Sequence, residues 1–195
     1  MRTAIALFTL LCALSSTAAG EKDSRVPDQV PFDRQALLML RVLAYDQNLH
    51  KRVSGNLTIA VIHGQTPESE RVQAAMVEAL KKISQESTVS GLQVRAVDVE
   101  YADPGTFEAR LTSSGAAVLY VCPGLEKDAL QTIADVAHRH SMLSFSGRES
   151  DVGLGVGIAL VRRSARAAII IDRSMVADAG ANLSPELLRV SEVRE

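Results

Sequence analysis

Short apolar runs alternate along the chain with longer segments in which apolar residues recur at helical spacing. Residues 57–62 and 116–121 are continuous apolar runs, as expected of strands that are covered on both faces of a parallel sheet. Residues 92–99 also have a strand pattern, but their alternation changes phase, which predicts an edge strand that is less evenly covered. A fourth, short strand is predicted over residues 142–145.

Helices are predicted between these strands. Thr66 can cap a helix that has Pro67 at its first position and carries the clearest amphipathic stripe in the chain, formed by Val72, Ala75, Met76, Ala79, Leu80 and Ile83. A short helix is predicted over residues 104–111, and the one after the third strand has a buried stripe of Leu130, Ile133, Ala134 and Ala137. Strands separated by helices imply right-handed parallel crossovers, so the pattern predicts an α/β three-layer sandwich with a mostly parallel sheet.

An additional helix is predicted before the first strand. Asp33 is placed to act as its N-cap, and the apolar pattern continues to about residue 51. Phe32 and Leu37 have the spacing of a hydrophobic staple across this N-cap.

The C-terminal third departs from the alternation of strand and helix. Residues 156–161 and 167–172 are apolar runs separated only by a short polar turn, which predicts an antiparallel hairpin. A short helix over residues 174–179 is predicted to end at Gly180. Ser184 and Pro185 begin a last helix, in which Leu183 and Leu188 have the spacing of a staple.

The beginning of the chain has the order of a secretory signal peptide. Arg2 is followed by an apolar run over residues 4–14, and then by the small residues Ser15, Ser16, Thr17, Ala18 and Ala19. The apolar run is shorter than the ~20 residues that a bilayer-spanning helix needs. We therefore predict a cleaved signal peptide over residues 1–19, a flexible leader over residues 20–31 and a single α/β domain over residues 32–195.

Charge and cysteine content narrow the function further. The formal net charge is −2, and the predicted signal peptide contains Arg2 as its one charged residue. The chain expected after cleavage therefore lacks the positive charge of a nucleic-acid-binding protein. Of the two cysteines only Cys122 remains after cleavage, which excludes an intramolecular disulfide. No later stretch approaches the length of a transmembrane helix, so the cleaved protein is not expected to span a membrane.

Candidate binding residues follow the predicted parallel strands. In such sheets, ligands bind at the carboxyl ends of the strands where the strand order reverses. This edge is expected to hold His63 and Gly64 after the first strand, Cys122 and Gly124 after the third, and Ser146 and Arg148 after the fourth. The alternative interpretation is that Gly64, Gly124 and the intervening Pro123 only shape tight strand exits.

Other patterns in the sequence could suggest nucleotide binding, metal binding or catalysis, but the residues do not support these interpretations. The glycine-rich run over residues 153–157 leads into a strand rather than a helix, which indicates a turn and not a dinucleotide fingerprint. His138 and His140 are two residues apart on a helix and therefore face different directions, so we expect no metal site there. Cys122 is interpreted as a buried structural cysteine, with an intermolecular bridge as the alternative. No activated serine motif supports a hydrolase.

The C-terminal third contains a more specific pattern. It begins with Met142-Leu143-Ser144-Phe145-Ser146-Gly147, continues through a glycine-led strand and its hairpin partner, and closes with Ala179-Gly180-Ala181-Asn182-Leu183-Ser184-Pro185-Glu186-Leu187-Leu188. In order and spacing this resembles the YfiR/HmsC family of small periplasmic proteins. One departure is that Asn48-Leu49-His50-Lys51 replaces the Trp-containing segment common after the first helix of the family. A second pair of cysteines, which some members have, is also absent.

The resemblance implies a periplasmic, non-catalytic regulator. Such a protein binds the periplasmic part of an inner-membrane diguanylate cyclase or sensor kinase and represses cyclic-di-GMP signalling, and thereby biofilm formation. It implies no catalytic residue, metal or cofactor, and leaves a homodimer open. The alternative function is a periplasmic solute-binding or sensor-accessory domain with a pocket at the strand ends, and an uncharacterised hydrolase is a third.

Overall fold

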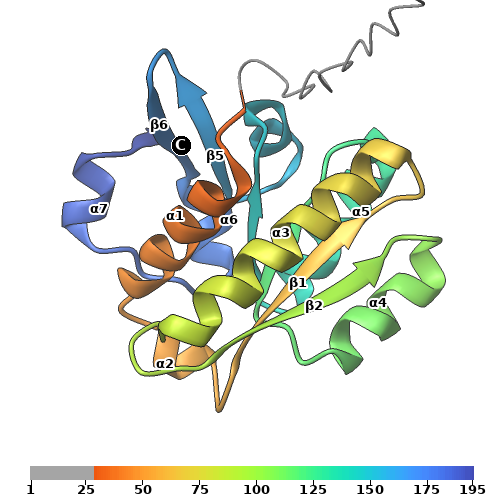
Figure 1. Cartoon of the computed structure of the whole chain (residues 1–195), viewed down its shortest axis with the longest axis horizontal. Helices are drawn as coiled ribbons and strands as arrows, with labels where there is room; N and C mark the ends of the chain where they lie inside the picture. The colour runs from red at the N-terminus through yellow and green to blue at the C-terminus, as the bar shows by residue number, and fades with distance from the viewer. Residues whose placement is uncertain (1–28) are drawn as a thin grey trace, which may run out of the picture.

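The computed structural model describes residues 29–195 (Figure 1). The predicted signal peptide, and the leader up to residue 28, lie outside these residues. The elements follow one another in the order α1 (Phe32–Ala44), α2 (Leu49–Arg52), β1 (Leu57–His63), α3 (Pro67–Glu86), β2 (Val94–Glu100), α4 (Pro104–Ser113), β3 (Val118–Val121), α5 (Lys127–Arg139), β4 (Leu143–Ser146), the 3-10 helix η1 (Glu149–Leu154), β5 (Ile158–Arg163), β6 (Arg166–Asp172), α6 (Arg173–Asp178), α7 (Pro185–Arg189) and β7 (Glu192–Arg194).

The strands form one 7-stranded sheet in the order β2-β1-β3-β4-β5-β6-β7. β1 to β5 pair in parallel, β6 is antiparallel to β5, and β7 is parallel to β6. The predicted fold class is thus confirmed, including the edge position of β2 and the C-terminal hairpin. β7 was not predicted from the sequence, because its residues are all exposed and lack an apolar pattern.

Helices cover both faces of the sheet, which gives three layers. Alternate residues of β1 belong to two different hydrophobic clusters: Ile59 and Val61 pack on the side of α1 and α3, whereas Ala60 and Ile62 pack on the side of α4 and α5. This is why the sequence of β1 is continuously apolar.

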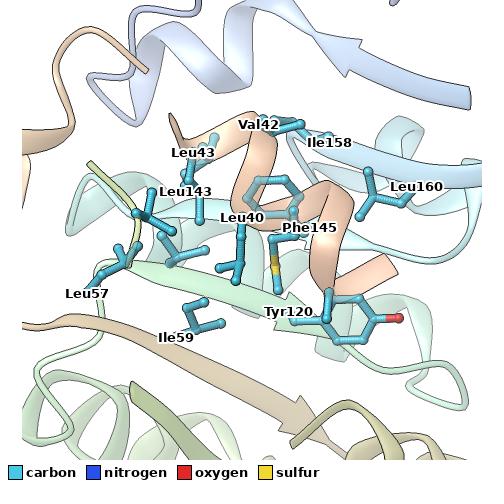
Figure 2. Close-up of a cluster of buried hydrophobic side chains, with 14 of the residues drawn as sticks. Leu40, Val42, Leu43, Leu57, Ile59, Tyr120, Leu143, Phe145, Ile158 and Leu160 are labelled. Atoms are coloured by element: carbon cyan, nitrogen blue, oxygen red, sulfur yellow. The ribbon is translucent and has the colours of Figure 1, made fainter. Parts of the chain in front are cut away.

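The larger of these clusters holds α1 onto the middle of the sheet. Figure 2 shows Leu40 and Leu43 of α1 above the strands, and the residues that it labels on the sheet are Leu57, Ile59, Tyr120, Leu143, Phe145, Ile158 and Leu160. All of these side chains are buried. Each large apolar side chain that is fully buried contributes about 1.5–3 kcal/mol to the free energy of unfolding, so α1 is an integral part of the core.

The N-terminal helix differs from the prediction in both of its ends. It begins at Phe32, with Pro31 at the N-cap position, so Asp33 lies in the first turn and is not the cap. Leu37 is 40% exposed and does not form the expected staple. The helix ends at Ala44 rather than continuing to residue 51, and α2 follows as a separate short turn of helix.

The break between α1 and α2 is caused by the buried carboxylate of Asp46. Its Oδ1 accepts hydrogen bonds from the backbone N–H groups of Asn48 (2.9 Å) and Asn182 (2.8 Å). Its Oδ2 accepts two from Arg52, at 3.2 Å from Nε and 2.8 Å from Nη2. An aspartate that binds the backbone two residues ahead competes with the helical hydrogen-bond pattern, so the chain leaves the helix here.

The starts of α3 and α7, which have a side-chain N-cap, were predicted correctly, in contrast to the start of α1. Thr66 Oγ1 accepts the N–H of Ser69 at the start of α3, and Ser184 Oγ accepts that of Leu187 at the start of α7, as predicted. Leu183 is buried and Leu188 is half-buried, and both pack against the α1 side of the core. Gly180 has a φ of +69°, consistent with its predicted role at the end of α6.

Candidate functional site

The carboxyl ends of the parallel strands meet at one edge of the sheet, as the strand pattern predicted. Ile62 of β1 pairs with Val121 of β3, and Val121 pairs with Ser146 of β4. The loops that carry the candidate residues therefore leave the sheet side by side. The strand order reverses at β1, which lies between β2 and β3.

Between β1 and β3 the two loops pack directly against each other. The N–H of Gly64 donates to Ser69 Oγ at 2.9 Å, and a Cβ on Gly64 would stand 3.1 Å from Leu125 Cδ2. A Cβ on Gly124, which has a φ of +84°, would stand only 2.5 Å from Thr66 Oγ1. The gap at the point of strand reversal is thus filled by the side chains of Leu125 and Thr66.

His63 faces the edge strand rather than this gap. Its Nδ1 lies 3.0 Å from the Gly64 carbonyl oxygen and its Nε2 lies 3.0 Å from Asp98 Oδ1. The second distance is that of an ion pair, but the orientation is not that of a hydrogen bond. His63 thus joins the end of β1 to the edge strand β2 and does not line the gap between β1 and β3.

Cys122 is a free, fully buried cysteine that packs in the cluster beneath α1 and α3. Burial raises the pKa of its thiol far above the usual range, and the charge of Asp98 raises it further. Cys122 is therefore a protonated, poorly nucleophilic thiol. Its burial agrees with the structural interpretation of this cysteine.

The loop after β4 is organised around the buried carboxylate of Asp151. This carboxylate accepts hydrogen bonds from Ser146 Oγ at 2.5 Å and from Arg148 Nη2 at 2.9 Å and Nε at 3.3 Å. Ser146 is buried, and its hydroxyl also accepts the N–H of Arg148 at 3.2 Å. Ser146 thus points inward, and Asp151 fixes the position of the Arg148 side chain at the surface.

A pocket of about 270 Å³ lies next to this loop, and we call it the strand-end pocket. Pro123 comes from the loop after β3, and Gly147 and Arg148 come from the loop after β4. The full lining is Gln29, Glu68, Pro123, Gly147, Arg148, Glu149, Val161 and Arg162. The predicted segments after β3 and β4 therefore meet here, but of the six candidate residues only Arg148 lines the pocket.

Seven of the eight lining residues were not among the candidates, although Pro123 and Gly147 lie in the predicted loops between them. Glu68 lies in the first turn of α3, directly after the loop that follows β1, so its position could have been inferred from the strand order. Glu149 follows Arg148 in the chain. Val161 and Arg162 belong to β5, and no motif in the sequence indicates that the hairpin forms a wall of this pocket.

The charge of Glu149 is already compensated by neighbouring arginines. Hydrogen bonds from Arg163 and Arg194 lower the pKa of this carboxyl group. Glu149 is thus ionised, and it fastens η1 to β5 and β7 rather than pointing freely into the pocket. The other charged lining residues are Arg148, Arg162 and Glu68, so the strand-end pocket carries both signs of charge.

Gly147 rests on a buried polar pair beneath the strand-end pocket. Tyr120 Oη donates to Gln35 Oε1 at 2.8 Å, and Gln35 Nε2 donates to the carbonyl oxygen of Val30 at 2.7 Å. A Cβ on Gly147 would stand 2.9 Å from Gln35 Oε1 and 3.2 Å from Tyr120 Oη. Any side chain at this position would displace the pair that joins β3 to α1.

His138, in the last turn of α5, and His140, directly after the helix, have separate partners. His138 Nδ1 lies 3.4 Å from Asp178 Oδ2, and His140 Nε2 lies 2.7 Å from Glu108 Oε1. In residues 29–195, no group of three potential ligands among His, Cys, Asp and Glu is close enough to hold a metal ion. Within the same residues no helix is long and apolar enough to cross a membrane.

Comparison with known proteins gives one family and several similar folds. The family model described as YfiR/HmsC-like matches residues 35–192. No curated protein matches the chain. Among solved structures, a conserved domain protein from Vibrio cholerae O1 biovar El Tor has a TM-score of 0.57 at 13% identity, over 85% of this chain and 60% of that one.

Two further solved structures have similar folds, and one of them is of a substrate-binding protein. The ligand-free, open structure of CD0873, a substrate-binding protein with adhesive properties from Clostridium difficile, has a TM-score of 0.59 at 13% identity, over 83% of this chain and 59% of that one. The ABC domain in complex with L-Trp from Streptococcus pneumoniae has a TM-score of 0.58 at 8% identity, over 84% and 61%. The chain thus spans about 60% of the length of each of these structures.

Proposed function

The chain belongs to the YfiR/HmsC-like family, and on that premise we propose that it is a periplasmic, non-catalytic repressor of an inner-membrane signalling protein. The proposed partner is the periplasmic part of a diguanylate cyclase or of a sensor kinase. Binding keeps the partner inactive and lowers cyclic-di-GMP. The observation that carries this proposal is the family match, which extends over residues 35–192 and includes both the parallel strands and the C-terminal hairpin.

A non-catalytic function agrees with the chemistry of the strand ends. The thiol of Cys122 is buried and has a raised pKa, so it is not an activated nucleophile. The hydroxyl of Ser146 donates to Asp151 inside the protein and does not face the strand-end pocket. Covalent catalysis needs an exposed nucleophile next to a general base. Neither the Cys122 thiol nor the Ser146 hydroxyl is such an exposed nucleophile.

The strand-end pocket offers a site for the signal that releases the partner. A ligand that weakens repressor binding by about 1.4 kcal/mol changes the affinity tenfold. Such a ligand needs only to bind the free repressor better than the bound one. Arg148 is the lining residue that Asp151 holds in place, and it therefore has a defined position for contact with a ligand or partner.

The second candidate function is solute binding or sensor accessory function at the strand-end pocket. The similarity to the substrate-binding protein CD0873 and to the L-Trp complex favours this alternative. On this alternative the solute is bound in the strand-end pocket, which has a volume of about 270 Å³.

The test is the level of cyclic-di-GMP in a strain from which the gene is deleted, with and without the gene of the candidate membrane partner. Repression predicts a rise after deletion, which disappears when the partner is also absent, together with copurification of the partner from membranes. Complementation with the wild-type gene should restore the low level. No change in cyclic-di-GMP in either background would refute repression and favour solute binding.

A further inference from the structure

A second cavity lies beside the strand-end pocket, between the start of α1 and the turn of the β5–β6 hairpin. It has a volume of about 180 Å³ and is lined by Val30, Pro31, Arg34, Arg162, Ala165, Arg166 and Ala167. Arg162 also lines the strand-end pocket, so the two cavities meet at this side chain. We call this second cavity the arginine cup.

The charge of the arginine cup is one-sided. Three arginines line the cup, Arg34 from α1 and Arg162 and Arg166 from the hairpin, and no Asp or Glu of residues 29–195 does so. Among residues 29–195, no carboxylate forms an ion pair with any of the three. The nearby Arg163 differs, because it is neutralised by Glu149 and Glu192.

The groups around the arginine cup affect the orientation of one arginine and the local charge. Arg162 Nε donates to the carbonyl oxygen of Ser164, which orients its guanidinium at the hairpin turn. The N-terminus of α1 lies at the same cup, since Pro31 and Arg34 line it, and a helix N-terminus adds partial positive charge. Asp33, in the first turn of α1, is the neighbouring acid, but it does not line the cup.

We propose that the arginine cup binds the dianionic head group of a small molecule. Guanidinium groups form bidentate hydrogen bonds with phosphate and carboxylate oxygens, and three of them match two negative charges better than one. The shared chemistry is that of a phosphomonoester or a short dicarboxylate. The uncharged body of the ligand extends past Arg162 into the strand-end pocket, where Glu68 disfavours a second anionic group.

The first experiment measures binding of inorganic phosphate, succinate and acetate to the purified chain by calorimetry at constant ionic strength. A dianion site predicts binding of phosphate or succinate with a Kd of about 1 mM or lower, and at least tenfold weaker binding of the monoanion acetate. Phosphate binding without succinate binding identifies the phosphomonoester class, and the reverse result identifies the dicarboxylate class.

The second experiment removes the arginines one at a time. Arg34→Gln, Arg162→Gln and Arg166→Gln should each weaken binding of the preferred dianion about tenfold, which corresponds to ~1.4 kcal/mol. The matched control is Arg189→Gln on α7, which is also an exposed arginine and has Glu186 as its carboxylate partner, and it should bind like the wild type. Melting temperatures verify that all four variants fold.

Three results would overturn the arginine cup as an anion site: no binding of either dianion at millimolar concentration, equal binding of acetate and dianions, or equal loss in the Arg189→Gln control. These measurements use purified protein and no membrane partner. The proposed repression can therefore fail while the cup binds its ligand, and the cup can fail while deletion still raises cyclic-di-GMP.

Discussion

Between β1 and β3 the strand order reverses and the two loops pack together, whereas between β3, β4 and β5 the loops stand apart. Leu125 and Thr66 fill the first gap, directly opposite the glycines that leave room for them. In the second gap, Asp151 holds Arg148 at the side and Gly147 forms the floor, so that a pocket of about 270 Å³ remains. Strand order thus selects the edge of the sheet, but side-chain volume decides which gap at that edge can accept a ligand.

The largest effect is expected from the group that keeps the second gap in shape. Asp151→Ala removes the acceptor of Ser146 and Arg148 and leaves the buried hydroxyl of Ser146 as a donor without an acceptor. We expect a loss of about 3 kcal/mol in the free energy of unfolding, measured by urea denaturation. The control Glu186→Ala removes an exposed carboxylate that pairs with Arg189 at 3.7 Å, and should change stability by less than ~0.5 kcal/mol. Equal effects in both variants would show that Asp151 does not organise the loop.

A smaller effect is expected from closing the first gap too tightly. Gly124→Ala places a Cβ against Thr66 Oγ1 at a positive φ, and should cost about 2 kcal/mol. Gly55→Ala is the matched control, because Gly55 has a similar φ of +86° but no atom within 4 Å of the added Cβ. It should cost only the backbone component, about 1 kcal/mol. If thermal or urea unfolding finds no difference between the two, the loops are not in close contact.

The smallest effect is expected at Cys122, behind the filled gap. Cys122→Ala removes a small buried side chain and should cost about 1 kcal/mol, without changing the oligomeric state on non-reducing gels. Because burial raises the pKa of the thiol, labelling by a thiol reagent should be slow in the native protein and fast after denaturation. A reducible dimer band in the wild type that the substitution removes would place Cys122 in an interface instead.

The contrast between the two gaps also shows what could be predicted from sequence. The strands and the shared edge could be predicted, since apolar runs such as residues 57–62 and caps such as Thr66 act locally. The lining could not, because Val161 and Arg162 reach the pocket only through the folding back of the hairpin. The end of α1 could not be predicted for the same reason. Asp46 ends this helix, which local propensity would continue, and one of its backbone partners, Asn182, is distant in sequence.

This last contact has a consequence for the order in which the molecule folds. The hydrogen bond from Asn182 to Asp46 closes a loop of 136 residues, and closing such a loop costs on the order of 4 kcal/mol of chain entropy. Contacts of this separation are typical of slowly folding topologies. During synthesis, which proceeds from the N-terminus, the Asp46 carboxylate lacks this partner until residue 182 has emerged. We therefore expect the turn between α1 and α2 to reach its final hydrogen bonds late, after residue 182 is available.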